Sequence, residues 1–377
     1  MKILISLSYY SPYISGLTLS VKRLAELLAG SGYTVTILTA KHDRTLPRRE
    51  DINAVSVVRV PYLFRVSKGF VMPEFVYLAY KELHNTDAVV IALPQVEGFI
   101  IAFLAKMLGR KVVSLYICEV TLSGGIVAKV IESVLRICNK MALDLSDEIV
   151  TLTDDFAEHN ATLKERSVSG IYPVMTPPEI NNDEKKSLQN KLPIKKFYIG
   201  FLGRIAHEKG ISYLLEAIPS LQKSLGDEFV IVLAGPRKTV GEGKYHAYIS
   251  NLLERFPNLV FQLGELEDNQ LGAFYSLLDV LVLPSTNNTE AFGMVQVEAM
   301  YCGTPVISTN LPGVRVPIKE TGMGIIVKPG DSKVLAEAIV EVLHNKKKYV
   351  KSPDAIKKVF SLDKILKSYR QLLQKRG

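Results

Sequence analysis

Several features that would restrict the environment of this protein are missing from its 377 residues. No segment approaches the ~20 apolar residues of a membrane-spanning helix, and the nearest candidate, residues 98–109, is shorter and carries Lys106. The N-terminus holds one lysine and a short apolar run, which predicts a first β-strand and not a signal peptide. We therefore expect a cytoplasmic protein, in which the sequons at Asn160 and Asn287 are not glycosylated.

Cysteine is scarce, and common metal and dinucleotide motifs are missing. The three cysteines, Cys118, Cys138 and Cys302, have no C-x-x-C spacing and do not cluster with histidine, which is typical of a reducing compartment and argues against structural zinc. No Asp-x-Asp sequence occurs, so a divalent metal has no obvious carboxylate ligands. No G-x-G-x-x-G motif occurs either, which argues against a nicotinamide dinucleotide fold. We expect neither a metal nor a cofactor.

Positive charge is concentrated at the C-terminal end. Residues 346–377 hold eleven Lys and Arg against Asp354 and Asp363, an excess of nine, so the rest of a chain of net charge +8 is near −1. This segment would bind an anionic surface such as membrane phospholipid, or else it is the solvated face of a terminal helix. Residues 62–83 mix Tyr and Phe with basic residues, as an interfacial segment would, or they form a helix packed on its domain. Nucleic acid is not an expected partner, because no aromatic residues interleave with a basic groove.

Short apolar segments alternate with amphipathic helices along the chain, which predicts parallel sheets covered on both faces. The expected strands are 2–8, 34–40, 55–60, 88–93, 111–117, 148–153, 197–203, 230–235, 260–264, 280–284, 305–309 and 324–328. The expected helices include 20–32, 126–143, 211–225 and 361–375. The fold class is therefore α/β, with two Rossmann-like, doubly wound parallel-sheet domains in series.

Four prolines and a charged, polar run interrupt this alternation between residues 173 and 193, which predicts an interdomain linker. The first domain then covers residues 1–172 and the second covers residues 194–355. A basic terminal helix is expected within residues 356–377.

The segment EAFGMVQVEAMYCGTP, residues 290–305, places Glu290 and Glu298 eight residues apart after a buried strand. The polar residues 287–289 predict a cap for a helix that begins near Ala291 and stops at Gly303. The two carboxylates would then lie about 12 Å apart along the helix axis. That separation is close to the span from the sugar to the ribose of a nucleotide sugar, with helix N–H groups available to the diphosphate between them.

Two further loops follow the first strand of each domain, where ligands bind in this architecture. The loop GRIAHEKG, residues 203–210, brings Arg204 and Lys209 to the start of a helix, where they would clamp a diphosphate and stabilise it as it departs. The alternative is a pair of surface charges beside Glu208. In the first domain, Gly16 would let the backbone approach a phosphate or sugar, although an ordinary strand-to-helix turn explains it equally well.

These loops, with AGP at 234–236 and CGTPVI after the second glutamate, resemble retaining glycosyltransferases of the GT-B superfold, family GT4. The resemblance covers nearly the whole chain and is strongest over residues 197–330. It implies that two domains face each other across a cleft, that the first binds the acceptor and the second the donor, and that the last helix returns to the first domain.

The resemblance also implies roles for individual residues. Arg204 and Lys209, preceded by Gly203, would bind the donor diphosphate and act in catalysis together with Glu290. Glu290 would contact the donor sugar, and Glu298 would hold the ribose. The remaining contacts would come from Gly16, from the backbone of Phe292, Gly293 and Met294, and from the loop 262–269, which includes Leu266 and matches the nucleobase site.

One position departs from the family pattern. Similar enzymes carry a histidine after the fifth strand, followed by Asp or Glu, whereas this chain has Cys118 and Glu119. The backbone carbonyl of Cys118 could still face the anomeric carbon, so both residues are candidate contacts to the donor sugar or acceptor. The alternative is that Cys118 is a small core residue.

The expected function is the transfer of a hexose from a nucleotide diphosphate sugar to an acceptor hydroxyl with retention of configuration, without a metal. A membrane lipid or lipid-linked glycan is the favoured acceptor, and a soluble sugar or sugar phosphate is the alternative. A catalytically impaired scaffold with the same fold is a third hypothesis. An epimerase fits less well, because the diphosphate clamp and the two glutamates suit transfer better.

Overall fold

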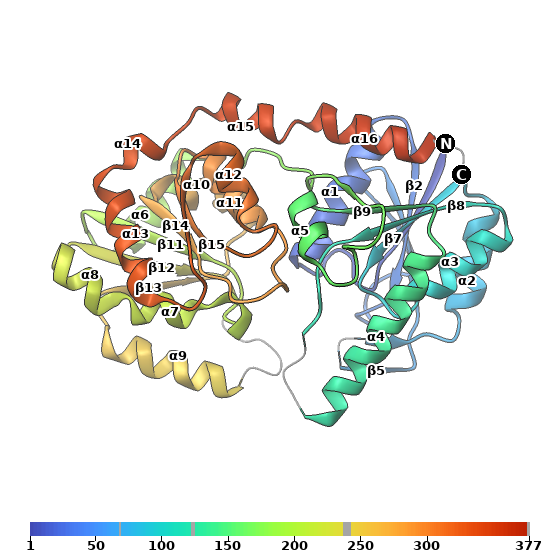
Figure 1. Ribbon diagram of the computed structural model, residues 1–377, viewed down its shortest axis with the longest axis horizontal. Helices are drawn as coiled ribbons and strands as arrows, with labels where there is room; N and C mark the ends of the chain where they lie inside the picture. Colours follow the sequence, from blue (N-terminus) through green and yellow to red (C-terminus); the bar gives the residue numbers. More distant parts are fainter. Residues whose placement is uncertain (68, 122–124, 237–242, 375–377) are drawn as a thin grey trace. The chain divides into compact units, whose positions relative to one another are not determined.

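The computed structural model describes residues 1–67, 69–121, 125–236 and 243–374 (Figure 1). The chain divides into two compact units, one comprising Met1–Val174 with Leu362–Gly377 and the other Met175–Ser361. The C-terminal helix α16 (Leu362–Gln374) thus belongs with the first unit, where it contacts strand β8 (Lys111–Tyr116). Each unit contains its own parallel sheet with helices, which confirms the predicted fold class.

The first unit is built on an eight-stranded sheet, counted over its described residues, with the order β10-β9-β8-β7-β1-β2-β4-β3. All neighbouring pairs are parallel except β3 and β4. The other strands of this sheet are β1 (Lys2–Ser6), β2 (Thr34–Ala40), β3 (Arg49–Ile52), β4 (Val55–Val60), β7 (Ala88–Leu93), β9 (Glu148–Thr151) and β10 (Ser169–Gly170). A separate hairpin pairs β5 (Phe64–Val66) with β6 (Gly69–Val71). The helices are α1 (Gly16–Gly30), α2 (Phe75–His84), α3 (Gly98–Met107), α4 (Ile126–Asp144), α5 (Asp154–His159) and α16.

The second unit has a wholly parallel six-stranded sheet over its described residues, in the order β13-β12-β11-β14-β15-β16. Its strands are β11 (Phe197–Leu202), β12 (Phe229–Ala234), β13 (Val260–Gly264), β14 (Val280–Leu283), β15 (Val306–Thr309) and β16 (Gly324–Val327). Every residue of β12 and β14 is buried, as expected where helices cover both faces of a parallel sheet. The helices are α6 (Asn182–Lys191), α7 (Ile211–Glu216), α8 (Ile218–Leu225), α9 (Gly243–Arg255), α10 (Asp268–Leu277), α11 (Met294–Tyr301), α12 (Val316–Thr321), α13 (Ser332–His344), α14 (Lys346–Tyr349) and α15 (Pro353–Val359).

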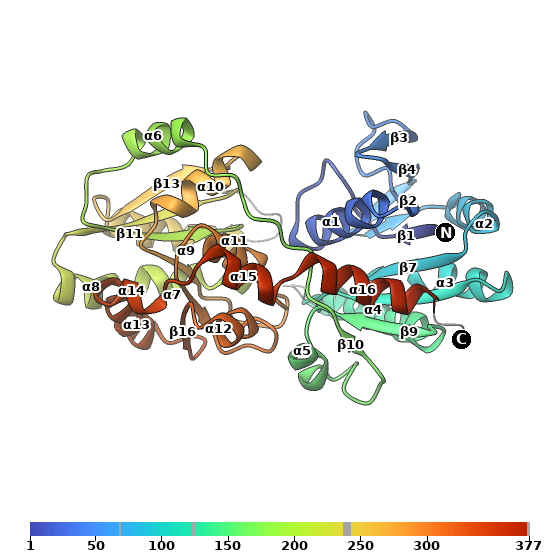
Figure 2. The ribbon, with the colours of Figure 1, turned by 90° about the horizontal axis from the view of Figure 1, so that it is seen from above.

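The segment expected to be a linker, residues 173–193, contains a helix in the structure. Helix α6 is capped by Asn181, whose side chain accepts hydrogen bonds from two backbone N–H groups, and it packs against α10 in the second unit (Figure 2). The chain just before α6 also touches α10, because a Cβ on Gly272 would lie 2.1 Å from the carbonyl oxygen of Glu179. Most of this segment is therefore part of the second unit.

The basic C-terminal segment, residues 346–377, is divided between the two units. Helices α14 and α15 belong to the second unit and α16 belongs to the first. Within the second unit, Lys346 forms a 2.8 Å ion pair with Asp279, so part of the positive charge is already neutralised. None of the helices described in the structure is both long enough and apolar enough to span a bilayer.

Candidate active site

The carboxyl ends of β11, β12 and β13 meet around two glycines in the second unit. The N–H of Gly203 donates to the carbonyl of Ala234 at 3.0 Å, and the N–H of Gly235 donates to that of Gly264 at 2.7 Å. Gly235 has φ 123°, and a Cβ there would lie 2.2 Å from the carbonyl oxygen of Gly203, so only glycine lets the two loops approach this closely. A small pocket opens beside them, lined by Phe201, Ile205, Leu233, Ala234, Gly235, Gln262 and Gly264.

The predicted nucleobase loop, residues 262–269, begins at this pocket. Gln262 and Gly264 line it directly, whereas Leu266 lies half-buried further along the loop. The loop ends in a capping box, in which the side chains of Glu267 and Gln270 satisfy backbone N–H groups at the start of α10. The helix cap thus fixes the end of the loop and leaves its beginning open to the pocket.

The loop after β11 is held against the loop after β14. The N–H of Thr286 donates to the carbonyl of Glu208 at 2.9 Å. Gly210 has φ 65°, and a Cβ there would lie only 2.0 Å from the carbonyl oxygen of Pro284. These contacts bring together two loops that are separated by about 80 residues of sequence.

The contact between the two loops places Lys209 against Glu290. The Lys209 Nζ lies 2.5 Å from the Glu290 Oε2, and the two side chains are only 22% and 15% exposed. Arg204 is paired as well, with its Nη2 2.9 Å from the Glu208 Oε1. Both cations predicted to bind a diphosphate therefore lie beside carboxylates, and the two pairs together carry no net charge.

Helix α11 begins at Met294, so the prediction that it begins near Ala291 with a cap from residues 287–289 is wrong. Gly293 precedes the helix with φ 77°, and a Cβ there would lie 2.4 Å from the Leu283 Cδ2. Asn287 instead accepts a hydrogen bond from the N–H of Thr289 at 3.0 Å, which closes a turn before the helix. Glu290 consequently lies in the loop and not in the first helical turn. No side chain caps α11, and the N–H of Gln296 already donates to the carbonyl of Gly293 at 2.9 Å, so the N–H groups at the helix start that can meet a ligand are those of Met294 and Val295.

Glu298 lies inside α11 and is nearly buried, with 5% of its surface exposed. The hydroxyl of Tyr275, itself fully buried, donates to the Glu298 Oε2 at 2.8 Å. Burial, together with the nearby Glu298 carboxylate, raises the pKa of Cys302 to about 12. Tyr275 was not identified from the sequence, because it lies 23 residues away on α10 and no local motif marks it.

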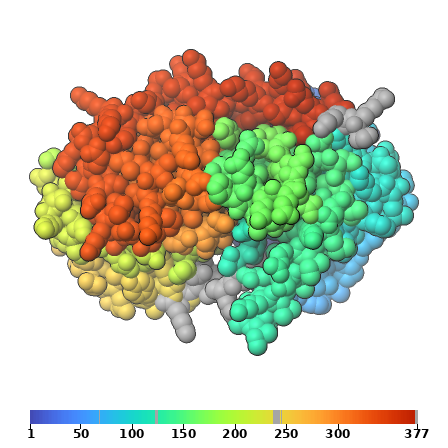
Figure 3. Space-filling view, viewed as in Figure 1, coloured from blue at the N-terminus to red at the C-terminus, as the bar shows by residue number. Residues whose placement is uncertain are grey.

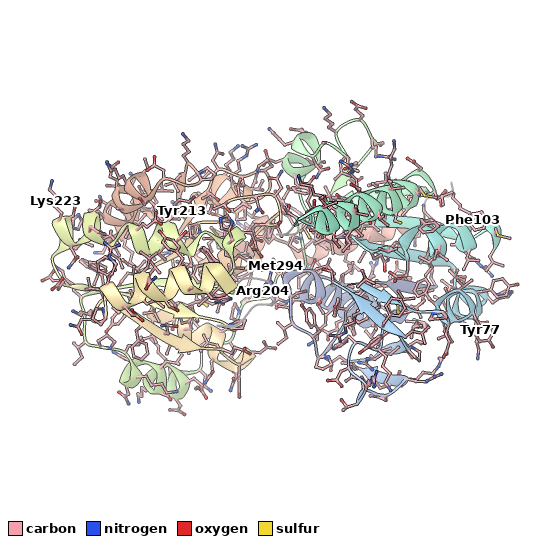
Figure 4. The ribbon with its side chains drawn as sticks, turned by 90° about the horizontal axis from the view of Figure 1, so that it is seen from below. Tyr77, Phe103, Arg204, Tyr213, Lys223 and Met294 are labelled. Atoms are coloured by element: carbon pink, nitrogen blue, oxygen red, sulfur yellow. The ribbon has the colours of Figure 1, made fainter. Side chains whose placement is uncertain are left out.

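Figure 4 labels Arg204 and Met294, which lie at the end of β11 and the start of α11.

The remaining predicted residues lie in the first unit. Gly16 is the first residue of α1, and a Cβ there would meet no atom within 4 Å. Cys118 is partly exposed just after β8, and the Glu119 Oε1 accepts a hydrogen bond from the Asn160 Nδ2 at 2.8 Å. Burial and the nearby Glu119 raise the pKa of Tyr116 to about 12. Within the described parts of the chain, no three His, Cys, Asp or Glu side chains group closely enough to hold a metal ion.

Comparison with known proteins agrees with this architecture. The family model of glycosyl transferases group 1 matches residues 182–359, and that of a glycosyl transferase 4-like domain matches residues 15–167. An uncharacterized glycosyltransferase of Methanocaldococcus jannaschii is 27% identical over 369 residues, which cover 91% of this chain and 89% of that protein. Phosphatidyl-myo-inositol mannosyltransferase of Mycobacterium leprae is 34% identical over 146 residues, which cover 38% of this chain and 37% of that protein. The structure of Anabaena HepE in complex with UDP-glucose has a TM-score of 0.73 at 18% identity, with 99% of both chains covered.

The two parallel-sheet units and these matches define a glycosyltransferase with the GT-B fold. Within that class, the chain belongs to the GT4 type, the glycosyl transferases group 1.

Proposed function

We propose that this protein transfers a hexose from a nucleotide diphosphate sugar to a hydroxyl of a membrane lipid or lipid-linked glycan, with retention of configuration. The observation that carries the proposal is the convergence of Lys209, Glu290 and the start of α11 at the carboxyl ends of the strands of the second unit. Cations, a carboxylate and free helix N–H groups are the parts needed to hold a diphosphate and its sugar.

In this proposal each part of the donor has its own contacts. Arg204 and Lys209 bind the diphosphate, assisted by the N–H groups at the start of α11. Glu290 accepts hydrogen bonds from the sugar hydroxyls, with the backbone of residues 292–294 beside it. Glu298, which accepts a hydrogen bond from Tyr275, also accepts hydrogen bonds from the ribose hydroxyls. The base lies against the loop 262–269, which begins beside the small pocket at Gly235 and Gln262.

The ion pairs suggest how donor binding and the sugar contact are linked. An arriving diphosphate competes with Glu290 for Lys209, and with Glu208 for Arg204. Once Lys209 turns to the diphosphate, the Glu290 carboxylate is released to accept hydrogen bonds from the sugar. The two cations then stabilise the charge that develops on the departing diphosphate, so no metal is required. The acceptor attacks from the face that the diphosphate leaves, without a covalent enzyme intermediate.

A membrane acceptor is supported by the surface of the first unit. Within the segment 62–83, Leu63, Phe64 and Tyr77 are 67%, 55% and 65% exposed. The relative from Mycobacterium leprae is named for a phosphatidyl-inositol acceptor, which is a membrane lipid. The enzyme would then work at the cytoplasmic face as a peripheral protein, with Cys118 and Glu119 near the acceptor or the donor sugar.

The test measures release of nucleoside diphosphate from UDP-, GDP- and ADP-hexoses with membrane extract as acceptor. Glu290→Ala and Lys209→Ala are expected to abolish release, whereas Lys223→Ala, an exposed lysine on α8, is expected to leave it unchanged. Equal turnover with an extract free of lipid would favour a soluble sugar or sugar phosphate acceptor. Lack of turnover with every donor would instead favour an impaired scaffold.

A further inference from the structure

Helix α4 (Ile126–Asp144) is only half covered by its own domain. Its buried residues, Cys138, Asn139, Ala142 and Leu143, all lie in its C-terminal half, where α4 packs against α3. No residue from 126 to 137 is buried. The helix forms a ridge on the face seen in Figure 3, and its first three turns carry side chains that the protein does not cover.

The uncovered part of α4 is apolar. Six large apolar side chains are 44–83% exposed: Ile126, Val127, Val130, Val134, Ile137 and Met141. At 3.6 residues per turn, these positions fall within an arc of about 100° on one side of the helix. A surface helix of a soluble domain normally turns its polar face to water, so this continuous apolar row indicates a surface that another phase or molecule covers.

A row of cations runs beside the apolar row. Lys129, Arg136 and Lys140 are all exposed, and they fall within an arc of about 40° that adjoins the apolar arc. The exposed side of the helix thus has an apolar half and a positive half up to Met141, and the exposed Asp144 at its C-terminal end pairs with Arg166. This division is typical of helices that lie in the plane of a membrane interface, with apolar side chains among the acyl chains and cations at the headgroups.

We propose that α4 docks this protein on the surface of a bilayer rich in anionic phospholipid. The positive row favours such a surface over a second copy of the chain, because a second copy would present the same cations. The neighbouring helices can extend the contact, since Tyr77 on α2 and Phe103 on α3 are 65% and 53% exposed (Figure 4). This inference extends the proposed membrane acceptor, but binding to lipid requires no transfer and can be measured without donor.

The test measures binding of the full-length protein to vesicles of phosphatidylglycerol and phosphatidylcholine by co-sedimentation. Replacing Ile126, Val130 and Ile137 together with serine is expected to lower the partition coefficient at least about tenfold. The matched control replaces Ile180, Ile194 and Val334, exposed apolar residues of the second unit, with serine, and is expected to bind as the parent does. Equal loss in both triple variants, or in neither, would overturn the proposal.

A second pair of variants tests the cations. Changing Lys129, Arg136 and Lys140 to glutamine is expected to weaken binding to anionic vesicles about a hundredfold, at roughly 1 kcal/mol for each charge, and to change binding to pure phosphatidylcholine little. The matched control changes the exposed Lys186, Lys223 and Lys333 of the second unit to glutamine. A loss in the control as large as that in the α4 variant would show that net charge, and not α4, directs binding.

The sequence contains no tryptophan, so an introduced one reports on a single site. The fluorescence of Val130→Trp is expected to shift to the blue when anionic vesicles are added, whereas that of Ile194→Trp, at a 98% exposed position, is expected to stay unchanged. An unshifted Val130→Trp spectrum would refute insertion of α4. A dimer without vesicles that the α4 serine variant converts to monomer would assign the apolar row to a second copy instead.

Discussion

The pairing of Lys209 with Glu290 makes an unusual prediction: removing the carboxylate should strengthen binding of a nucleoside diphosphate while it abolishes transfer. Glu290→Gln keeps the shape of the side chain but removes the charge that lies 2.5 Å from the Lys209 Nζ. Lys209 then no longer has to leave a partner in order to bind phosphate. The sugar hydroxyls, in contrast, lose their charged acceptor.

The expected magnitude follows from the geometry. The carboxylate charge is shared by two oxygens, so the centres of charge lie further apart than the nearest atoms, and two unit charges roughly 4 Å apart attract by about 4 kcal/mol at an effective dielectric constant of 20, before the cost of removing them from water is subtracted. Because both side chains are partly exposed and the diphosphate restores the lost attraction, we expect a net gain of about 1 kcal/mol. That gain corresponds to about fivefold tighter binding.

Titration calorimetry with UDP, GDP and ADP measures this affinity, and donor turnover is measured in parallel. The matched control is Glu228→Gln, which removes the partner of Lys196 at the start of β12, at the opposite end of the same sheet, and should leave the affinity unchanged. Weaker or unaltered binding of every diphosphate to Glu290→Gln would refute competition between Glu290 and phosphate for Lys209.

Three further predictions concern the helix that carries the second glutamate. Gly293→Ala forces φ 77° on a residue with a Cβ, and that Cβ would lie 2.4 Å from a methyl group of Leu283. The free energy of unfolding should therefore fall by about 2–4 kcal/mol in denaturant titrations, and an unchanged midpoint would contradict the strain argument. Tyr275→Phe removes the buried hydroxyl that donates to Glu298, so the free energy of unfolding should fall by about 1.5–3 kcal/mol. Nucleotide affinity should fall roughly tenfold in calorimetry, and full affinity would show that Tyr275 does not position the carboxylate. Cys118 and Cys302 are both partly exposed, but burial raises the pKa of Cys302 to about 12, so its thiol should stay protonated at pH 9 and react with iodoacetamide more slowly than that of Cys118. Equal labelling of the two cysteines in mass spectrometry would refute this.

Much of the fold could be predicted because its signals are local. The strands expected at 34–40, 55–60, 88–93 and 260–264 match β2, β4, β7 and β13 residue for residue, since short segments rich in β-branched and other apolar residues between helical patterns mark the strands of a parallel sheet. The edge strands β3 and β10 were not predicted. Their sequences, REDI and SG, have no apolar pattern, and only pairing with a neighbouring strand makes them extended.

Helix boundaries depended more on three-dimensional context. The helix expected at 211–225 divides at Ala217 into α7 and α8, with Pro219 in the first turn of the second. The start of α11 shifted from Ala291 to Met294, because Gly293 adopts a left-handed conformation against the core. Neither outcome follows from periodicity, which continues across both positions.

The sequence by itself determined the class of fold, the strand-end loops and the residue types that a diphosphate and a sugar require at those loops, because each depends on a short stretch of chain. Only the tertiary structure decided which of these residues meet. The packing of Gly210 against Pro284 brings Lys209 to Glu290, and the packing of α10 beside α11 places the Tyr275 hydroxyl within hydrogen-bond distance of Glu298. The tertiary structure also left half of α4 uncovered, since the burial of a helix face is set by neighbours that are distant in sequence and not by the helix itself.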